Sequence, residues 1–203
     1  MKRVSVVVLC ALVLTAMGCA KPPTDKVAAA EQAVSDAREA GGQAYMAEDY
    51  AKLEGMLANA KKEIADQDAK IALTRDYEKA EQLLVAVQTD ATRVKAEAGK
   101  KKEEAKAAAL QAQQAAQAAV KRTQELVAKA PVGKDRAAVE SIKADAQGLN
   151  ASLAEVQAAM DAGDYLSAQT KAKAIQDKAQ AVAGEIQTAL AKVAAGKGKK
   201  KGK

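Results

Sequence analysis

Apolar residues recur every three or four positions along most of this chain, as they do on one face of an α-helix. Gly41-Gly42, Pro131-Val132-Gly133 and Gly163 interrupt the pattern, and new apolar stripes begin near Asp49 and Asp76. Much of the spacing alternates strictly between three and four, which is typical of supercoiled helices. The sequence therefore predicts an all-α fold, an elongated up-and-down helical bundle of about five helices with antiparallel coiled-coil hairpins. The predicted core positions are Val27, Ala30, Val34, Ala37, Tyr50, Leu53, Leu57, Ala60, Ile64, Tyr77, Ala80, Leu84, Val87, Ala91, Val94, Ala98, Val139, Ile142, Ala146, Leu149, Leu153, Val156, Met160, Tyr165, Ala168, Ala172, Ile175, Ala179, Val182, Ile186, Ala189 and Val193.

Residues 99–124 form an alanine-, glutamine- and lysine-rich tract in which this pattern weakens. These residue types favour helix, but the pattern leaves open whether one helix runs unbroken across Gly99. No apolar stripe that would form a partner groove is visible in residues 105–120. We expect an N-terminal helical region, 24–130, with three helices of which the last is long, and a C-terminal antiparallel helical hairpin, 134–194.

An internal repeat places Asp-Tyr at three predicted helix starts, in residues 47–64, 74–91 and 162–179. Asp favours a helix N-terminus through capping and through the helix dipole, and Thr24 or Asp25 is the expected N-cap of the first helix. Each tyrosine falls on a core stripe, with its hydroxyl expected near water. We interpret the tyrosines as core residues; the alternative is a partner-binding row.

The composition argues against catalysis. The chain has no His, so the usual acid/base group at neutral pH and the commonest metal ligand are missing. Asp and Glu are spread along the helices beside Lys, as on solvated faces. No phosphate-binding loop or dinucleotide fingerprint occurs. We therefore expect a protein that is not an enzyme and that has no cofactor and no metal.

The first twenty residues have the pattern of a secretory signal peptide. Lys2 and Arg3 precede an uncharged, mostly apolar run over residues 4–17, and Gly18 and Cys19 follow. Residues 16–19, Ala-Met-Gly-Cys, resemble the lipobox of bacterial lipoproteins. That resemblance implies cleavage of residues 1–18 between Gly18 and Cys19, acylation of Cys19, as by palmitate, and a short linker, 19–23. The alternatives are an uncleaved membrane anchor and plain secretion.

The resemblance also implies a location. A processed lipoprotein is held on a bacterial membrane by its acyl chains and faces the periplasm. Ala20, and not Asp, follows Cys19, which favours the outer membrane over the inner one under the enterobacterial sorting rule.

Residues 26–64 are similar to a helical domain of envelope lipoproteins that has no assigned function. Some members of that family carry the domain ahead of an OmpA-like peptidoglycan-binding module. No such module is visible in this chain. The resemblance implies a helical fold and an envelope location, and it brings no active site with it.

The segment 195–203 is strongly basic and is expected to be disordered. It carries Lys197, Lys199, Lys200, Lys201 and Lys203, and without it the body of the chain is near neutral. Outside the cytoplasm its candidate contacts are anionic: lipid headgroups, lipopolysaccharide or peptidoglycan, and not nucleic acid. The murein lipoprotein is similar in being a lipidated coiled coil with a terminal lysine, which in that family is joined covalently to peptidoglycan. The alternative is a tail that only solubilises the chain.

Together these observations predict a non-enzymatic, lipid-anchored structural or scaffolding lipoprotein of the bacterial cell envelope. The alternative is a periplasmic adaptor or chaperone-like module that binds protein partners through its coiled-coil helices. An apolar groove left open after the bundle closes would favour the alternative.

Overall fold

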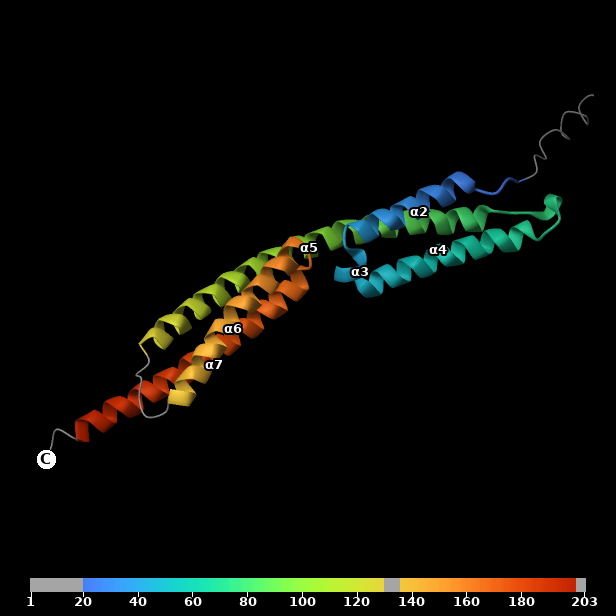
Figure 1. Ribbon diagram of the computed structural model, residues 1–203. Helices are drawn as coiled ribbons and strands as arrows, with labels where there is room; N and C mark the ends of the chain where they lie inside the picture. Colours follow the sequence, from blue (N-terminus) through green and yellow to red (C-terminus); the bar gives the residue numbers. More distant parts are fainter. Residues whose placement is uncertain (1–19, 130–135, 200–203) are drawn as a thin grey trace, which may run out of the picture. The chain divides into compact units, whose positions relative to one another are not determined.

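The computed structural model describes residues 20–129 and 136–199, and all of their regular structure is helical (Figure 1). This confirms the predicted all-α helical bundle. The four-residue helix α3 was not expected and lies in the connection that follows Gly41. The elements are α2 (Thr24–Glu39), α3 (Gly42–Tyr45), α4 (Ala47–Asp68), the 3-10 turn η2 (Ala72–Thr74), α5 (Glu78–Ala128), α6 (Arg136–Asp161) and α7 (Tyr165–Lys199).

The chain divides into two compact units, residues 1–101 and residues 102–203. Helix α5 runs unbroken past Gly99 and contributes residues to both units. The expected division at residues 131–133 is therefore wrong, because the second half of α5 joins α6 and α7. The predicted antiparallel hairpin is present as α6 and α7, but it shares its unit with the second half of α5.

The core of the first unit is formed by α2, α4 and the first half of α5. Leu53, Leu84, Val87 and Val94 are fully buried there, and alanines fill the layers between them. The predicted stripes of all three segments are buried or partly buried, as the helical period requires.

Gly41 and Gly42 make the corner between α2 and α4. Gly41 has a φ of 97°, a left-handed conformation that glycine adopts readily. A Cβ on Gly42 would lie 2.8 Å from the Ala37 carbonyl oxygen and 2.9 Å from the Tyr50 ring. The corner therefore needs both glycines, one for its backbone conformation and one for its closeness to neighbours.

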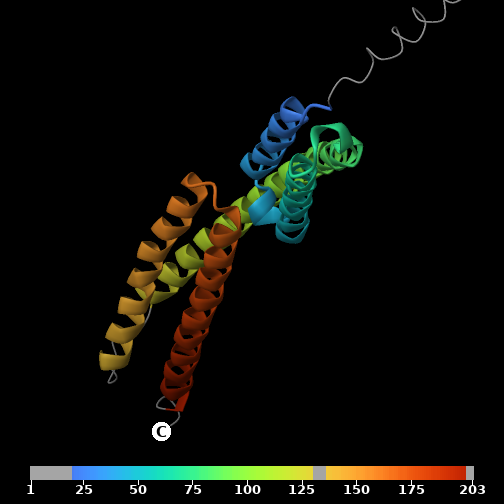
Figure 2. The ribbon, with the colours of Figure 1, turned by 90° about the vertical axis from the view of Figure 1, so that its right-hand side faces the viewer.

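The core of the second unit is formed by the second half of α5 with α6 and α7, and α6 and α7 run antiparallel (Figure 2). Ala109, Ala112, Ala116 and Val120 of α5 are buried against them. The alanine-rich tract thus has a buried stripe that the sequence pattern did not reveal. The described core positions of α6 and α7 are buried or partly buried as predicted, whereas the side chains of Val139 and Val193 lie outside the described residues.

Two polar contacts join α5 to its partners in this core. The Thr123 hydroxyl, fully buried, lies 2.8 Å from the Ala179 carbonyl oxygen on α7 and 2.9 Å from its own helix at Ala119. The Gln113 side chain donates to the Gln157 side-chain oxygen on α6 at 2.8 Å. These bonds fix the register of small, otherwise featureless alanine layers.

The helix starts follow the Asp-Tyr repeat only in part. The Asp76 and Asp164 carboxylates accept hydrogen bonds from the backbone N–H groups of Glu78 and Ser167, at 2.9 and 3.1 Å. Asp49 is paired with Arg93 instead. The prediction of Thr24 or Asp25 as an N-cap is wrong, because α2 begins directly after Pro23 and has no side-chain cap.

Helix α7 continues to Lys199, so the prediction that the chain is disordered from residue 195 is wrong for the backbone of residues 195–199. Extending an existing helix costs far less than starting one, and lysines near its C-terminal end complement the helix dipole. Residues 200–203 lie outside the described part of the chain.

Candidate functional site

The residues predicted for lipidation and for polyanion contact fall mostly beyond the described ranges. Gly18 and Cys19 lie outside them, as do Lys200, Lys201 and Lys203. Lys197 and Lys199 belong to the last turns of α7, but their side chains are outside the described part. Both site assignments therefore stay predictions. Among residues 20–129 and 136–199, no helix is long and apolar enough to cross a membrane.

The most exposed large apolar side chains of the described residues lie in the α4–α5 loop, residues 69–77. Ile71 is 77% exposed and Leu73 is 80% exposed. Sequence reasoning missed this pair; the available signal was two large aliphatic residues, two positions apart, between two helices and off both core stripes. They are candidates for a contact with something outside the chain.

Hydrogen bonds on both sides of the pair hold this loop in one conformation. The Arg75 guanidinium donates to the carbonyl oxygens of Asp68 and Lys70, at 2.8 and 3.0 Å. The Thr74 backbone N–H and hydroxyl both donate to the Ile71 carbonyl oxygen, at 2.8 and 2.9 Å. Ile71 and Leu73 are thus presented by a structured turn.

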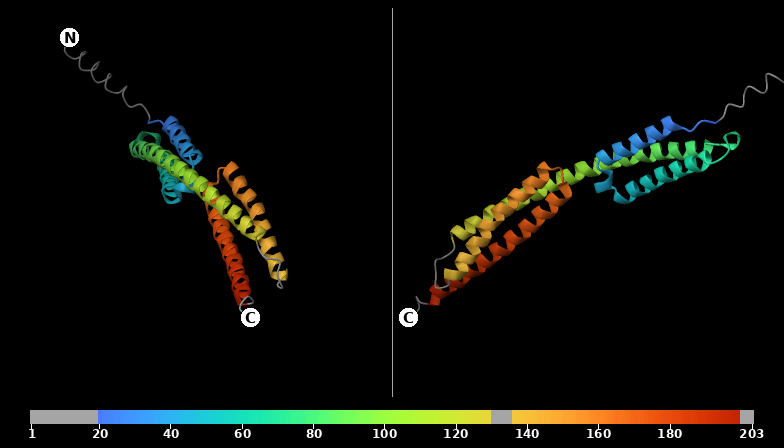
Figure 3. Two further views of the ribbon diagram at one scale, coloured as in Figure 1. Left: turned by 90° about the vertical axis from the view of Figure 1, so that its left-hand side faces the viewer. Right: turned by 45° about the vertical axis from the view of Figure 1, so that its right-hand side comes forward.

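The α4–α5 loop lies at the same end of the first unit as the start of α2 (Figure 3). Lys26, in the first turn of α2, pairs with Glu81 at 2.6 Å, and Glu81 is four residues from the loop's last residue, Tyr77. The Gln88 side chain also reaches the Lys26 carbonyl oxygen, at 3.5 Å. The described segment Ala20–Pro23 enters α2 at this end.

The tyrosines of the repeat are core residues in the first unit. Tyr50 and Tyr77 are buried. The Tyr77 hydroxyl donates to the Asp68 carboxylate across the loop, and this bond, with burial, raises the pKa of Tyr77. Tyr165 is half-buried against the second core. The core interpretation is confirmed for Tyr50 and Tyr77. The Tyr77 hydroxyl was expected near water and bonds Asp68 instead.

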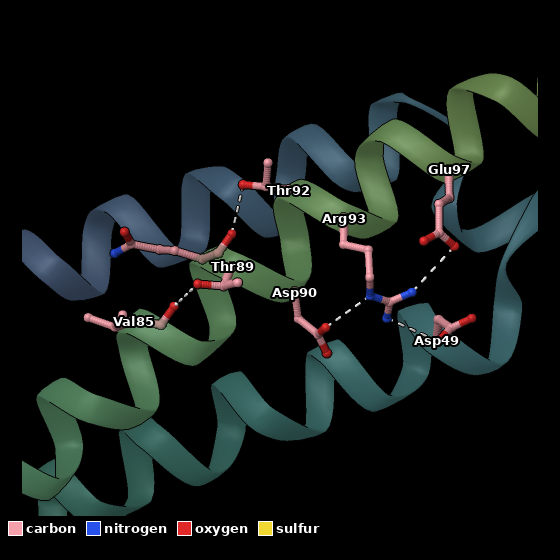
Figure 4. Close-up of polar contacts among 8 residues, drawn as sticks. Asp49, Val85, Thr89, Asp90, Thr92, Arg93 and Glu97 are labelled. Atoms are coloured by element: carbon pink, nitrogen blue, oxygen red, sulfur yellow. Dashed lines mark hydrogen bonds and ion pairs between the residues drawn. The ribbon is translucent and has the colours of Figure 1, made fainter.

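Ion pairs join α2, α4 and α5 to one another in the first unit. Arg93 on α5 reaches Asp49 on α4 at 3.2 Å and also contacts Asp90 and Glu97 on its own helix, at 3.1 and 3.4 Å (Figure 4). Lys79 bonds Glu63 at 2.6 Å, which lowers the pKa of Glu63 and raises the pKa of Lys79. The other interhelical pairs are Lys26–Glu81, Lys61–Glu31 and Lys95–Asp36. These carboxylates are matched by cations on a neighbouring helix and serve the packing of the bundle.

An open groove of about 370 Å³ lies between α5 and α7 in the second unit. No apolar stripe was visible in the sequence of residues 105–120, and the groove forms only when α7 packs beside this tract. Small side chains make its floor and glutamines with one arginine its rim. The lining residues are Ala115, Ala118, Ala119, Arg122, Thr123, Gln176, Ala179, Gln180, Ala183, Gly184 and Gln187.

In the described ranges no group of three or more His, Cys, Asp or Glu residues could hold a metal ion. Every buried side-chain nitrogen or oxygen there has a hydrogen-bond partner.

Comparison of the chain with protein-family models, with curated proteins and with solved structures gives no match. The resemblances of residues 16–19 to a lipobox and of residues 26–64 to an envelope-lipoprotein domain therefore stay predictions from the sequence.

Proposed function

We propose that this protein is a non-enzymatic lipoprotein of a bacterial cell envelope, held on a membrane by acylated Cys19 and acting as a structural or scaffolding element. The observation that carries the proposal is the leader, in which a basic start and an apolar run end at Gly18-Cys19. Several acyl chains on one residue would anchor the chain stably, at roughly 0.8 kcal/mol per buried CH₂ group.

Two features of the described residues support a scaffolding role. Interhelical ion pairs and closely packed alanines stabilise the first unit. In the second unit, a buried hydrogen bond joins α5 to α7. The basic segment 195–203 begins within the last turns of α7 and is the candidate contact for an anionic envelope polymer, with peptidoglycan and lipopolysaccharide the first to test.

The test is metabolic labelling with palmitate and membrane fractionation of wild type, Cys19→Ala and a variant lacking residues 195–203. Acylation and membrane partitioning should require Cys19 and should not require the tail. Recovery on detergent-boiled sacculi only when the tail is present would establish a link to the wall. Equal membrane partitioning of Cys19→Ala without label would refute the lipoprotein proposal.

The groove between α5 and α7 favours a second candidate, an adaptor that binds a helical partner. Its floor of small side chains would let another helix approach closely. A photocrosslinking residue at Gly184, which has open space around it, should capture a discrete partner in cells. The same residue at exposed Glu155 on α6 is the control. Equal crosslinking from both positions would contradict the adaptor.

A further inference from the structure

We propose that the α4–α5 loop is a second membrane contact of this protein, in which Ile71 and Leu73 enter the lipid interface beside acylated Cys19. The proposal rests on the proposed lipid anchor and names a further part of the chain that touches the same bilayer. Its occupant is a lipid surface, and not a protein partner.

The apolar pair of the loop is unusually exposed. Ile71 and Leu73 are 77% and 80% exposed and lie two positions apart, while the other exposed large apolar residues of the described ranges stand singly on helix faces. Removing both side chains from water favours the bound state, and each fully buried aliphatic side chain is worth about tenfold or more in partitioning.

The loop lies close to the proposed anchor. The loop and the start of α2 lie at one end of the first unit, as Figure 3 and the Lys26–Glu81 ion pair show. The chain from Cys19 to Thr24 has five peptide steps and can span at most about 18 Å. An anchor at Cys19 would therefore hold this end of the unit, with Ile71 and Leu73, next to the membrane.

The loop is already ordered by hydrogen bonds. Arg75 and Thr74 already bond the loop backbone, and the Gln67 side chain accepts from the Asp76 backbone N–H at 3.1 Å and from Lys70 at 2.9 Å. Because the turn is formed before contact, insertion does not have to order it.

The charged residues around the loop predict how its membrane contact depends on lipid composition. Lys70 and Arg75 flank the apolar pair, as basic residues often do at a membrane interface, but Asp68 and Asp76 lie beside them. The loop is close to charge balance. Its contact should therefore be apolar and should depend only weakly on the fraction of anionic lipid.

The chain has no Trp, so Leu73→Trp supplies a single fluorescent probe in the full-length protein. Val85→Trp, also in the first unit and at a 53% exposed position on α5, is the matched control. The purified proteins are reconstituted with phosphatidylethanolamine–phosphatidylglycerol vesicles that contain brominated lipid. We expect a blue shift and quenching for Leu73→Trp and neither for Val85→Trp. Unquenched, water-like emission from vesicle-bound Leu73→Trp would overturn the proposal.

Two further measurements distinguish a membrane contact of the loop from self-association and from a failure of the proposed anchor. Blue-shifted emission that rises with protein concentration without vesicles would mean that a second copy covers the pair, and it would also overturn the proposal. Mass spectrometry reports acylation of Cys19 independently. If the residue is not acylated, a Cys10→Ser variant coupled through Cys19 to a maleimide lipid supplies the anchor, so the loop is tested even when the proposed function fails.

The energetic consequence is measured by transfer between vesicles. An Ile71→Ser/Leu73→Ser variant should leave donor vesicles at least about tenfold faster than wild type, whereas Val85→Ser should not. Equal transfer rates would count against any contribution of the loop to membrane residence.

Discussion

Ala116 provides the sharpest test of how the second unit is built. It is fully buried between α5 and its partner helices, whereas Ala118, two residues along the same helix, is exposed. Replacing each alanine with Asp makes the same chemical change at a buried and at an exposed position, on opposite faces of α5. Any difference between the two variants then measures the packing of this tract.

The magnitude follows from the two environments. Both variants lose helix propensity, by no more than about 0.7 kcal/mol, and this loss cancels in the comparison. At position 116 the carboxylate enters a space that fits a methyl group, among the apolar side chains of the second core. An unpaired buried charge costs about 3–5 kcal/mol, a large share of the roughly 5–15 kcal/mol that stabilises a domain.

The assay is urea unfolding of the full chain at neutral pH in a Leu166→Trp background, because Leu166 is an exposed position in the second unit and the chain has no other Trp. Burial would raise the pKa of the Asp introduced at 116 in the folded state. The deficit should therefore be largest at neutral pH and should shrink as the pH falls and the carboxyl is neutral in both states. Equal stabilities of Ala116→Asp and Ala118→Asp would refute the packing of the tract.

Three further outcomes are expected. Gly42→Ala should destabilise by about 1–3 kcal/mol, because its Cβ would meet the Ala37 carbonyl, while Gly55→Ala, in open space, should stabilise by about 0.8–1 kcal/mol; thermal melts followed by circular dichroism compare them. Thr123→Val keeps the shape of the buried side chain and loses its bond to Ala179, so it should cost about 1 kcal/mol in urea, and a neutral result would show that the hydroxyl is dispensable. Glu63→Gln should lower the free energy of unfolding at neutral pH, because it removes the ion pair with Lys79. The difference from wild type should disappear as the pH falls below about 4.3 and through the lowered folded-state pKa of Glu63. A difference that does not change with pH would contradict the role of the Lys79 pair.

In the first unit, the helical spacing of apolar residues was sufficient to predict which positions are buried. Every predicted core position from Val27 to Ala98 is buried or partly buried, because the face on which a residue lies depends only on local helix geometry. A large residue such as Leu53 differs clearly from its polar neighbours Lys52 and Glu54, so the core stripe can be recognised without knowledge of the partner helices. The break at Gly41-Gly42 was also predicted from the sequence, because two consecutive glycines interrupt the apolar pattern and end a helix.

In the alanine-rich tract, the sequence pattern did not predict which positions are buried. Ala107 is exposed and Ala109 is fully buried, although they are the same residue type two positions apart. Alanine is small enough for a core and a strong enough helix former for a surface, so its presence does not report burial. The groove between α5 and α7 and the unit boundary near residue 101 were missed for this reason.

The sequence by itself determined that the chain is helical, where most of its helices begin and end, and which positions of the long stripes are buried, because these properties depend on local spacing and propensity. It also carries the whole case for a lipid anchor at Cys19, since the described residues do not include that site. Only the tertiary structure decided that α5 is shared by two units, that Tyr77 bonds Asp68, and that Ile71 and Leu73 stay uncovered at the end where α2 begins. These properties depend on which surfaces meet, and a pattern along one chain does not record what packs against each face.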